Sequence, residues 1–116
     1  MKRYRVIFHI DEPSKGRADQ VLINITNLLD DLGQDVVEVE LLANGGGVRA
    51  MARGSGSTAE QVEVLAQRGV HFVACQHSLE HLSMQREDLL DLVDVVPAGV
   101  SELVKKQAEG WAYIRP

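Results

Sequence analysis

The sequence has a single cysteine among its 116 residues and lacks any long apolar run. One cysteine, Cys75, cannot form a disulfide within the chain, and it cannot supply the paired thiolates of a zinc ribbon or a Cys-x-x-Cys redox motif. No stretch approaches the roughly 18 consecutive apolar residues that a membrane-spanning helix needs. If Cys75 acts chemically, it therefore acts alone or across subunits.

An excess of positive charge is also missing. Lysine and arginine number 12 against 17 aspartates and glutamates, giving a net charge of −5. The electrostatic field of a protein with net negative charge repels phosphate backbones and anionic lipid heads, so we expect neither a nucleic acid nor a membrane as partner. The basic residues at 1–5 lead into Val6-Ile7-Phe8, an apolar run too short for a signal peptide, which favours a cytoplasmic protein.

Length and composition are those of one domain. Apolar residues make up 45% and charged residues 25% of the chain, close to the averages of globular proteins. A chain of this length can bury a core without disulfides or a structural metal. We expect one domain over residues 1–116.

Apolar patterning predicts strands that alternate with helices. The expected strands are 3–10, 36–43, 70–74, 93–96 and 111–114, and in the second of them Glu38 and Glu40 predict one solvated face. Three longer helices are expected. The first carries an apolar stripe at 18–32 and ends at Gly33, the second runs from a Thr58/Gln61 capping box to Gly69, and the third has Val100, Leu103 and Val104 on its apolar face and ends at Gly110. Shorter helices are expected at 48–53, 76–82 and 85–92.

This alternation predicts an α/β fold with three layers, α/β/α, around a mainly parallel five-stranded sheet, because each parallel crossover needs a covering helix. The core is expected to contain Leu28, Leu29, Leu65, Phe72 and Val73. His71, inside the third strand, is expected to be a packed or hydrogen-bonded core residue.

Ligands of parallel sheets bind beyond the carboxyl ends of the strands. Segments far apart in sequence should meet there, and the candidate ligand-binding residues are His9, Asn44, Gly45, Gly46, Gly47, Gln76 and Gly99. Residues 45–50 formally fit the dinucleotide motif G-x-G-x-x-A, but they follow the second strand and their helix is short. We therefore interpret the glycines as permitting positive φ and close backbone approach, with small-anion binding still open.

Cys75 is the candidate catalytic residue, with His77 as its possible activator. It ends a buried strand and precedes a helix, whose free N–H groups would stabilise a thiolate. A nearby imidazole would do the same. The alternative is that Cys75 fills the core. His77 and His81 share a helix face and could hold a metal together with Cys75 or Glu80, but two histidines on a short polar helix are more often solvated, so no metal is expected.

Five segments give the chain a familiar pattern: Val6 to Ile10, Asn27 to Gly33, Phe72 to Cys75, Val95 to Val100 and Gly110 to Pro116. Together they resemble the DsrE/DsrF-like (DsrEFH-like) family, in its short stand-alone branch. The resemblance implies a three-layer fold, assembly as a trimer or hexamer, and a cysteine after the third strand that carries sulfur as a persulfide. Only Cys75 matches that role, and Asn44 to Gly47 matches the family's glycine-containing loop.

The leading hypothesis is a sulfur-trafficking protein, a persulfide relay in which Cys75 takes sulfane sulfur from a donor and passes it to an acceptor thiol or protein. It needs no cofactor. One alternative is a homo-oligomeric binding module for a small anion or nucleotide-like ligand, with Cys75 only lining the pocket. Another is a metal or redox sensor that uses Cys75, His77 and His81.

Overall fold

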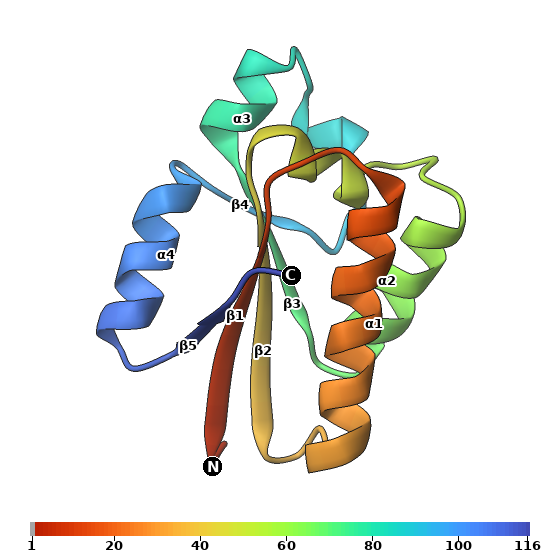
Figure 1. Ribbon diagram of the computed structural model, residues 1–116. Helices are drawn as coiled ribbons and strands as arrows, with labels where there is room; N and C mark the ends of the chain where they lie inside the picture. Colours follow the sequence, from red (N-terminus) through yellow and green to blue (C-terminus); the bar gives the residue numbers. More distant parts are fainter. Residues whose placement is uncertain (1) are drawn as a thin grey trace.

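Five parallel strands form a single sheet in the computed structural model, which describes residues 2–116 (Figure 1). The sheet order is β4-β3-β2-β1-β5. The strands are β1 (Tyr4–Ile10), β2 (Val37–Ala43), β3 (His71–Cys75), β4 (Asp94–Val96) and β5 (Ala112–Ile114). Every strand end lies within one residue of its predicted position.

Helices cover both faces of this sheet. They are α1 (Lys15–Leu32), α2 (Ser57–Gln67), α3 (Gln76–His81) and α4 (Gly99–Ala108), with 3₁₀ helices η1 (Gly45–Met51) and η2 (Arg86–Asp88). Helices α1 and α2 lie on one face, α4 lies alone on the other, and α3 stands at the carboxyl edge (Figure 1). The predicted three-layer α/β/α class is confirmed. No helix within residues 2–116 combines the length and apolar character required to cross a bilayer.

The longest helix follows directly from local sequence signals. Ser14 caps α1 by accepting a hydrogen bond from the Arg17 N–H, at 3.2 Å. Gly33 ends it at φ +93°, a conformation that favours glycine. Between these ends, the buried positions repeat with the expected period and are Ala18, Val21, Leu22, Ile25 and Leu29.

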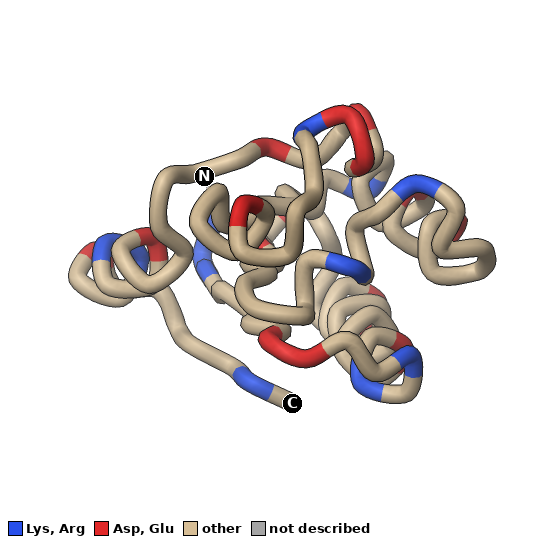
Figure 2. Tube along the Cα trace, turned by 90° about the horizontal axis from the view of Figure 1, so that it is seen from above, with Lys and Arg blue, Asp and Glu red and all other residues tan. Residues whose placement is uncertain are grey.

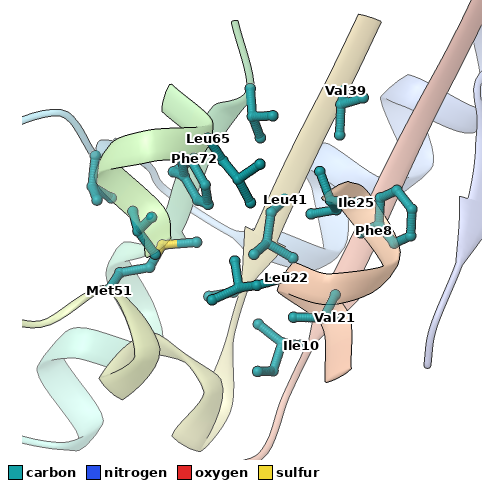
Figure 3. Close-up of a cluster of buried hydrophobic side chains, with 14 of the residues drawn as sticks. Phe8, Ile10, Val21, Leu22, Ile25, Val39, Leu41, Met51, Leu65 and Phe72 are labelled. Atoms are coloured by element: carbon teal, nitrogen blue, oxygen red, sulfur yellow. The ribbon is translucent and has the colours of Figure 1, made fainter. Parts of the chain in front are cut away.

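The larger part of the core lies between the sheet and the α1/α2 layer. Phe8 and Leu41 on the sheet pack with Ile25 and Leu65 from the helices, and Phe72 is 1% exposed (Figure 3). Val73 and Leu29 are buried as predicted. Leu28 is only partly buried, because it lies beside the stripe that faces the sheet.

A smaller cluster fills the space under α4. It consists of Ile7, Leu42, Val73, Leu103 and Trp111. The expectation that Val100 and Val104 share this buried face was wrong, since each is 63% exposed. Helix α4 has no neighbouring helix on its face of the sheet (Figure 1). Of the three residues, only Leu103 is buried.

The predicted solvated face of β2 was wrong at Glu40, which is fully buried. Its Oε1 atom lies 3.7 Å from Nδ1 of His71 and 3.8 Å from Nζ of Lys106. Burial acts to raise the pKa of Glu40, but contacts with His71, Glu102 and Lys106 outweigh it, so the pKa lies below its ordinary value. Charged partners from distant segments therefore make burial of this carboxylate tolerable.

The pKa values of two groups that contact Glu40 are shifted as well. Contact with Glu40 raises the pKa of Glu102 to about 7, because two neighbouring carboxyl groups resist carrying two charges. Contacts with Glu40 and Asp94 raise the pKa of His71 to about 9, against the effect of burial. The prediction that His71 is a core residue was wrong, because its side chain is 49% exposed, although it does hydrogen-bond Asp94.

Three local predictions also needed correction. The Thr58/Gln61 capping box does not form, because α2 begins earlier, with Gly56 at its cap and Thr58 buried inside the first turn. The loop glycines at 45–47 already belong to η1. The helix expected at 85–92 is reduced to η2, which Gln85 and Asp88 cap reciprocally.

Candidate functional site

The three central strands end level with one another at the carboxyl edge. Ile10 of β1 pairs with Ala43 of β2, and Ala43 pairs with Ala74 of β3. Asn44 and Cys75 therefore follow at the same height. The first turn of α4 lies against Asn44 and Cys75, since a Cβ atom at Gly99 would be 3.2 Å from the Cβ atom of each of them.

Cys75 is the last residue of β3 and the N-cap of α3, and it is 5% exposed. Burial acts to raise the pKa of its thiol. Hydrogen bonds from the Ser78 side chain and from the backbone N–H groups of Gly99, Ser78 and His77 outweigh burial, so the pKa of Cys75 lies below its ordinary value. Donors from two helices thus converge on one sulfur, and they favour the thiolate.

Ser78 is the functional residue that the sequence analysis missed. Its Oγ accepts a hydrogen bond from the Gly45 N–H at 2.7 Å, which leaves its own O–H to donate to the Cys75 sulfur. The available signal was its spacing, three residues after a cysteine that ends a strand, where a first-turn hydroxyl reaches back to the cap.

Position 99 requires glycine because neighbouring side chains lie too close for a Cβ atom, and not because of its backbone φ angle. A Cβ atom there would lie 3.2 Å from the Cβ atoms of Cys75 and Asn44 and 3.5 Å from Cδ2 of Leu42. The missing side chain lets α4 begin against the sheet edge, where its first N–H reaches the sulfur.

A second hydrogen-bonded group lies next to the cysteine. Nε2 of His9 is 2.7 Å from Oδ1 of Asn44, and Nδ1 is 2.7 Å from the hydroxyl of Tyr113 on β5. Because an amide oxygen only accepts, Nε2 of His9 donates to Asn44, and Nδ1 shares a hydrogen bond with the Tyr113 hydroxyl. His9 is 9% exposed, so this chain fixes its ring beneath the edge.

The glycine loop is shaped by contact with the end of β1. Gly45 has φ +53°, a Cβ atom at Gly46 would lie 2.7 Å from Cδ of Pro13, and one at Gly47 would lie 2.1 Å from the Ile10 carbonyl oxygen. Side chains are therefore excluded at these positions by backbone and proline atoms, in agreement with the interpretation of close approach.

The other predicted residues, Gln76 and His77, begin helix α3. The Gln76 side chain donates to Oε1 of Glu80 at 3.1 Å. His77 is exposed, and the hydrogen bond it gives the sulfur comes from its backbone; an effect of its imidazole on Cys75 remains a prediction. Among residues 2–116, no three histidine, cysteine, aspartate or glutamate side chains are grouped to hold a metal ion.

Comparison with known proteins adds the family context. The family model described as DsrE/DsrF-like matches residues 2–116. A protein of unknown function from Methanobacterium thermoautotrophicum, MTH1491, has a similar structure with a TM-score of 0.91 and 43% identity, covering 97% of this chain and 99% of that one. The ychN protein of E. coli shares the fold at 14% identity and a TM-score of 0.80, with both chains fully covered. No curated protein matches this chain.

Proposed function

Since the chain belongs to the DsrE/DsrF-like family, we propose that it carries sulfane sulfur as a persulfide on Cys75. The family is linked to sulfur relay, and Cys75 stands where the resemblance expects the carrier cysteine. The other parties to the reaction are a sulfur donor and an acceptor, each a protein or a small thiol.

The observation that carries this proposal is the set of donors around the sulfur. Three backbone N–H groups and the Ser78 hydroxyl hydrogen-bond Cys75 and lower the pKa of its thiol. A cysteine that only fills a core does not need four donors, because a neutral thiol hydrogen-bonds weakly. The same donors would stabilise the negative charge of a persulfide anion.

The chemistry requires no cofactor. The Cys75 thiolate attacks a sulfane sulfur of the donor, the donor's own sulfur–sulfur bond breaks, and the remaining donor sulfur leaves as a thiolate. An acceptor thiolate then attacks the outer sulfur of the Cys75 persulfide and releases the Cys75 thiolate. Each step exchanges one sulfur–sulfur bond for another, so no oxidant is consumed.

Access to the sulfur sets the kind of reaction partner. Cys75 is 5% exposed, so a donor or an acceptor reaches its sulfur only when the first turn of α3 or of α4 moves aside. We expect the carrier to work as a homo-oligomer, a trimer or hexamer, in which a neighbouring subunit can border the same edge.

Intact-mass spectrometry tests the proposal. After incubation with inorganic polysulfide and removal of excess reagent, the protein should gain the mass of one sulfur atom, and a reductant should remove it. Cys75 is the only cysteine, so the site is unambiguous and Cys75→Ser serves as the control. A wild-type protein that gains no sulfur, and whose thiol is alkylated only after unfolding, would support the ligand-binding alternative instead.

A further inference from the structure

Helix α4 covers Cys75 with its first turn, but it has little apolar surface to hold it on the sheet. It stands apart from the other helices and carries charges of both signs (Figure 2). Its buried residues are Gly99 and Leu103, while Val100 and Val104 point to solvent. Contacts of another kind are therefore needed to fix its first turn against the sulfur.

One face of α4 turns toward the sheet. Its residues follow the helical spacing i, i+3, i+4 and i+7, and they are Gly99, Glu102, Leu103 and Lys106. Gly99 lies against Cys75, and Leu103 belongs to the small apolar cluster under the helix. Glu102 and Lys106 both meet Glu40 of β2. Polar groups thus take sheet-facing positions that a surface helix usually fills with apolar side chains.

Glu40 is the residue of the sheet that receives both polar contacts. It is fully buried, and its Oε1 atom lies 3.8 Å from Nζ of Lys106 and 3.7 Å from Nδ1 of His71. Glu102 hydrogen-bonds the same carboxylate. A buried charge is costly unless it is paired. Departure of α4 would leave His71 as the remaining partner of Glu40, so the carboxylate holds the helix in place.

The contact at Glu40 and the contact at the sulfur lie at opposite ends of α4. On the sheet, Glu40 is in register with His71, and Cys75 follows His71 by four residues, roughly 13 Å along the strand. On the helix, Lys106 follows Gly99 by seven residues, roughly 10 Å. Helix α4 therefore runs from the sulfur back to Glu40 (Figure 1), and its anchorage at one end fixes the depth of its N-terminus at the other.

We propose that Glu40 is a positioning residue for Cys75. Through Glu102 and Lys106 it holds α4 at the depth where the Gly99 N–H bonds the sulfur, and it thereby favours the thiolate. Its role in sulfur transfer rests on the proposed carrier function, whereas its effect on the thiol does not. Release of α4 at Glu40 uncovers the sulfur and removes one of its donors at the same time.

Alkylation of Cys75 across a pH series measures these two effects separately. The midpoint follows the pKa of the thiol, and the plateau rate at high pH follows access to the sulfur. Glu40→Gln should raise the plateau, and it should raise the midpoint by about one pH unit, as expected for loss of a hydrogen bond to a charged group.

The sign of the midpoint shift decides between explanations. A direct effect of charge would lower the midpoint in Glu40→Gln, because removal of a negative charge favours a thiolate. Loosening of the core without loss of the Gly99 N–H would raise the plateau alone. A midpoint that is unchanged or lower in Glu40→Gln would overturn the proposal.

Variants on α4 test the same contact if Glu40→Gln does not fold. Lys106→Met keeps an apolar stem beside Trp111, whose ring centroid lies 4.6 Å from Nζ, but it removes the ammonium group. It should raise the midpoint as well, whereas Lys106→Arg should keep the wild-type value. Lys105→Met is the matched control, because it removes the same charge from an exposed position of the same helix. Equal midpoints in Lys106→Met and Lys105→Met would overturn the proposal.

Incubation with inorganic polysulfide separates this proposal from the carrier function. If polysulfide adds sulfur to wild-type Cys75 and the midpoint is unchanged in Glu40→Gln and Lys106→Met, Glu40 does not position the thiol and the carrier function stands. If the midpoints rise and wild-type Cys75 takes up no sulfur, the carrier function is wrong, and Glu40 positions a thiol with a different task.

Discussion

The backbone N–H of Gly45 donates to Oγ of Ser78 over 2.7 Å. This bond joins the glycine loop after β2 to the helix that begins at Cys75. That bond holds the Ser78 oxygen in place and leaves its own O–H free to donate to the sulfur. The loop therefore acts on the cysteine through the serine.

Ser78→Ala should raise the pKa of the Cys75 thiol, because it removes the side-chain donor and leaves the raising effect of burial. Loss of a hydrogen bond to a charged group predicts an alkylation rate at neutral pH about tenfold lower. The measurement is the rate of reaction with a small alkylating reagent across a pH series. Ser101→Ala, on the exposed side of α4, is the control, and equal rates in both variants would contradict the role of Ser78.

Gly99→Ala should also slow alkylation of Cys75 at neutral pH. The added methyl group would lie 3.2 Å from Cβ of Cys75 and of Asn44, so α4 must shift outward and draw its N–H away from the sulfur. Gly16→Ala is the control, because its Cβ would meet only Oγ of Ser14 at 3.6 Å. If Gly99→Ala lowers the melting temperature but leaves the pH midpoint of alkylation unchanged, the Gly99 N–H does not tune the thiol.

Stability should fall as the pH rises above about 5, because of Glu102. Its pKa is raised from 4.5 to about 7 in the folded protein, so between these values the folded state holds a proton that the unfolded state releases. The stability this proton linkage gives is complete below 4.5 and is lost by about pH 7. Thermal unfolding across this range checks it, with Glu102→Gln expected to flatten the curve and Glu109→Gln, at the exposed C-cap of the same helix, to leave it unchanged.

Because of His71, the stability of the folded protein should continue to fall at more alkaline pH. Its pKa is raised from 6.5 to about 9 in the folded state, so its contribution is present below 6.5 and is lost as the pH approaches 9. His71→Gln should remove the alkaline part of the decline, whereas the exposed His81→Gln should not. A melting temperature that rises over this interval in the wild-type protein would contradict the assignment.

Self-association is expected through the side of the molecule that α4 only partly covers. Val100 and Val104 are each 63% exposed on that helix, and the resemblance to the family implies trimers or hexamers. Glutamate at both positions should lower the mass measured by light scattering at micromolar concentration. Ile23→Glu, at a site 54% exposed on α1, is the matched control. A monomeric wild-type protein would refute the expectation.

The sequence predicted elements whose signals are local, and it missed contacts made between distant segments. Strand ends and the α1 helix follow from apolar periodicity, Ser14 and Gly33. Glu40 was read as solvated because its partners, His71 and Lys106, lie far along the chain. Ser78 was overlooked for the same reason, since its role depends on Gly45. Thr58 looked like the N-cap because a capping-box pattern does not show that Gly56 caps the helix two residues earlier.

The burial of Glu40 also bears on how the sheet chooses its pairing. β2 is hydrogen-bonded on both sides, and a shift of one residue would turn all of its side chains to the opposite faces. Glu40 would then point into the apolar layer under α1 without a counter-ion, at a cost of several kcal/mol, and Leu41 would meet Lys106. A strand of aliphatic residues alone would accept either register with little penalty. One buried charged side chain at the centre of β2 thus disfavours the shifted alignment.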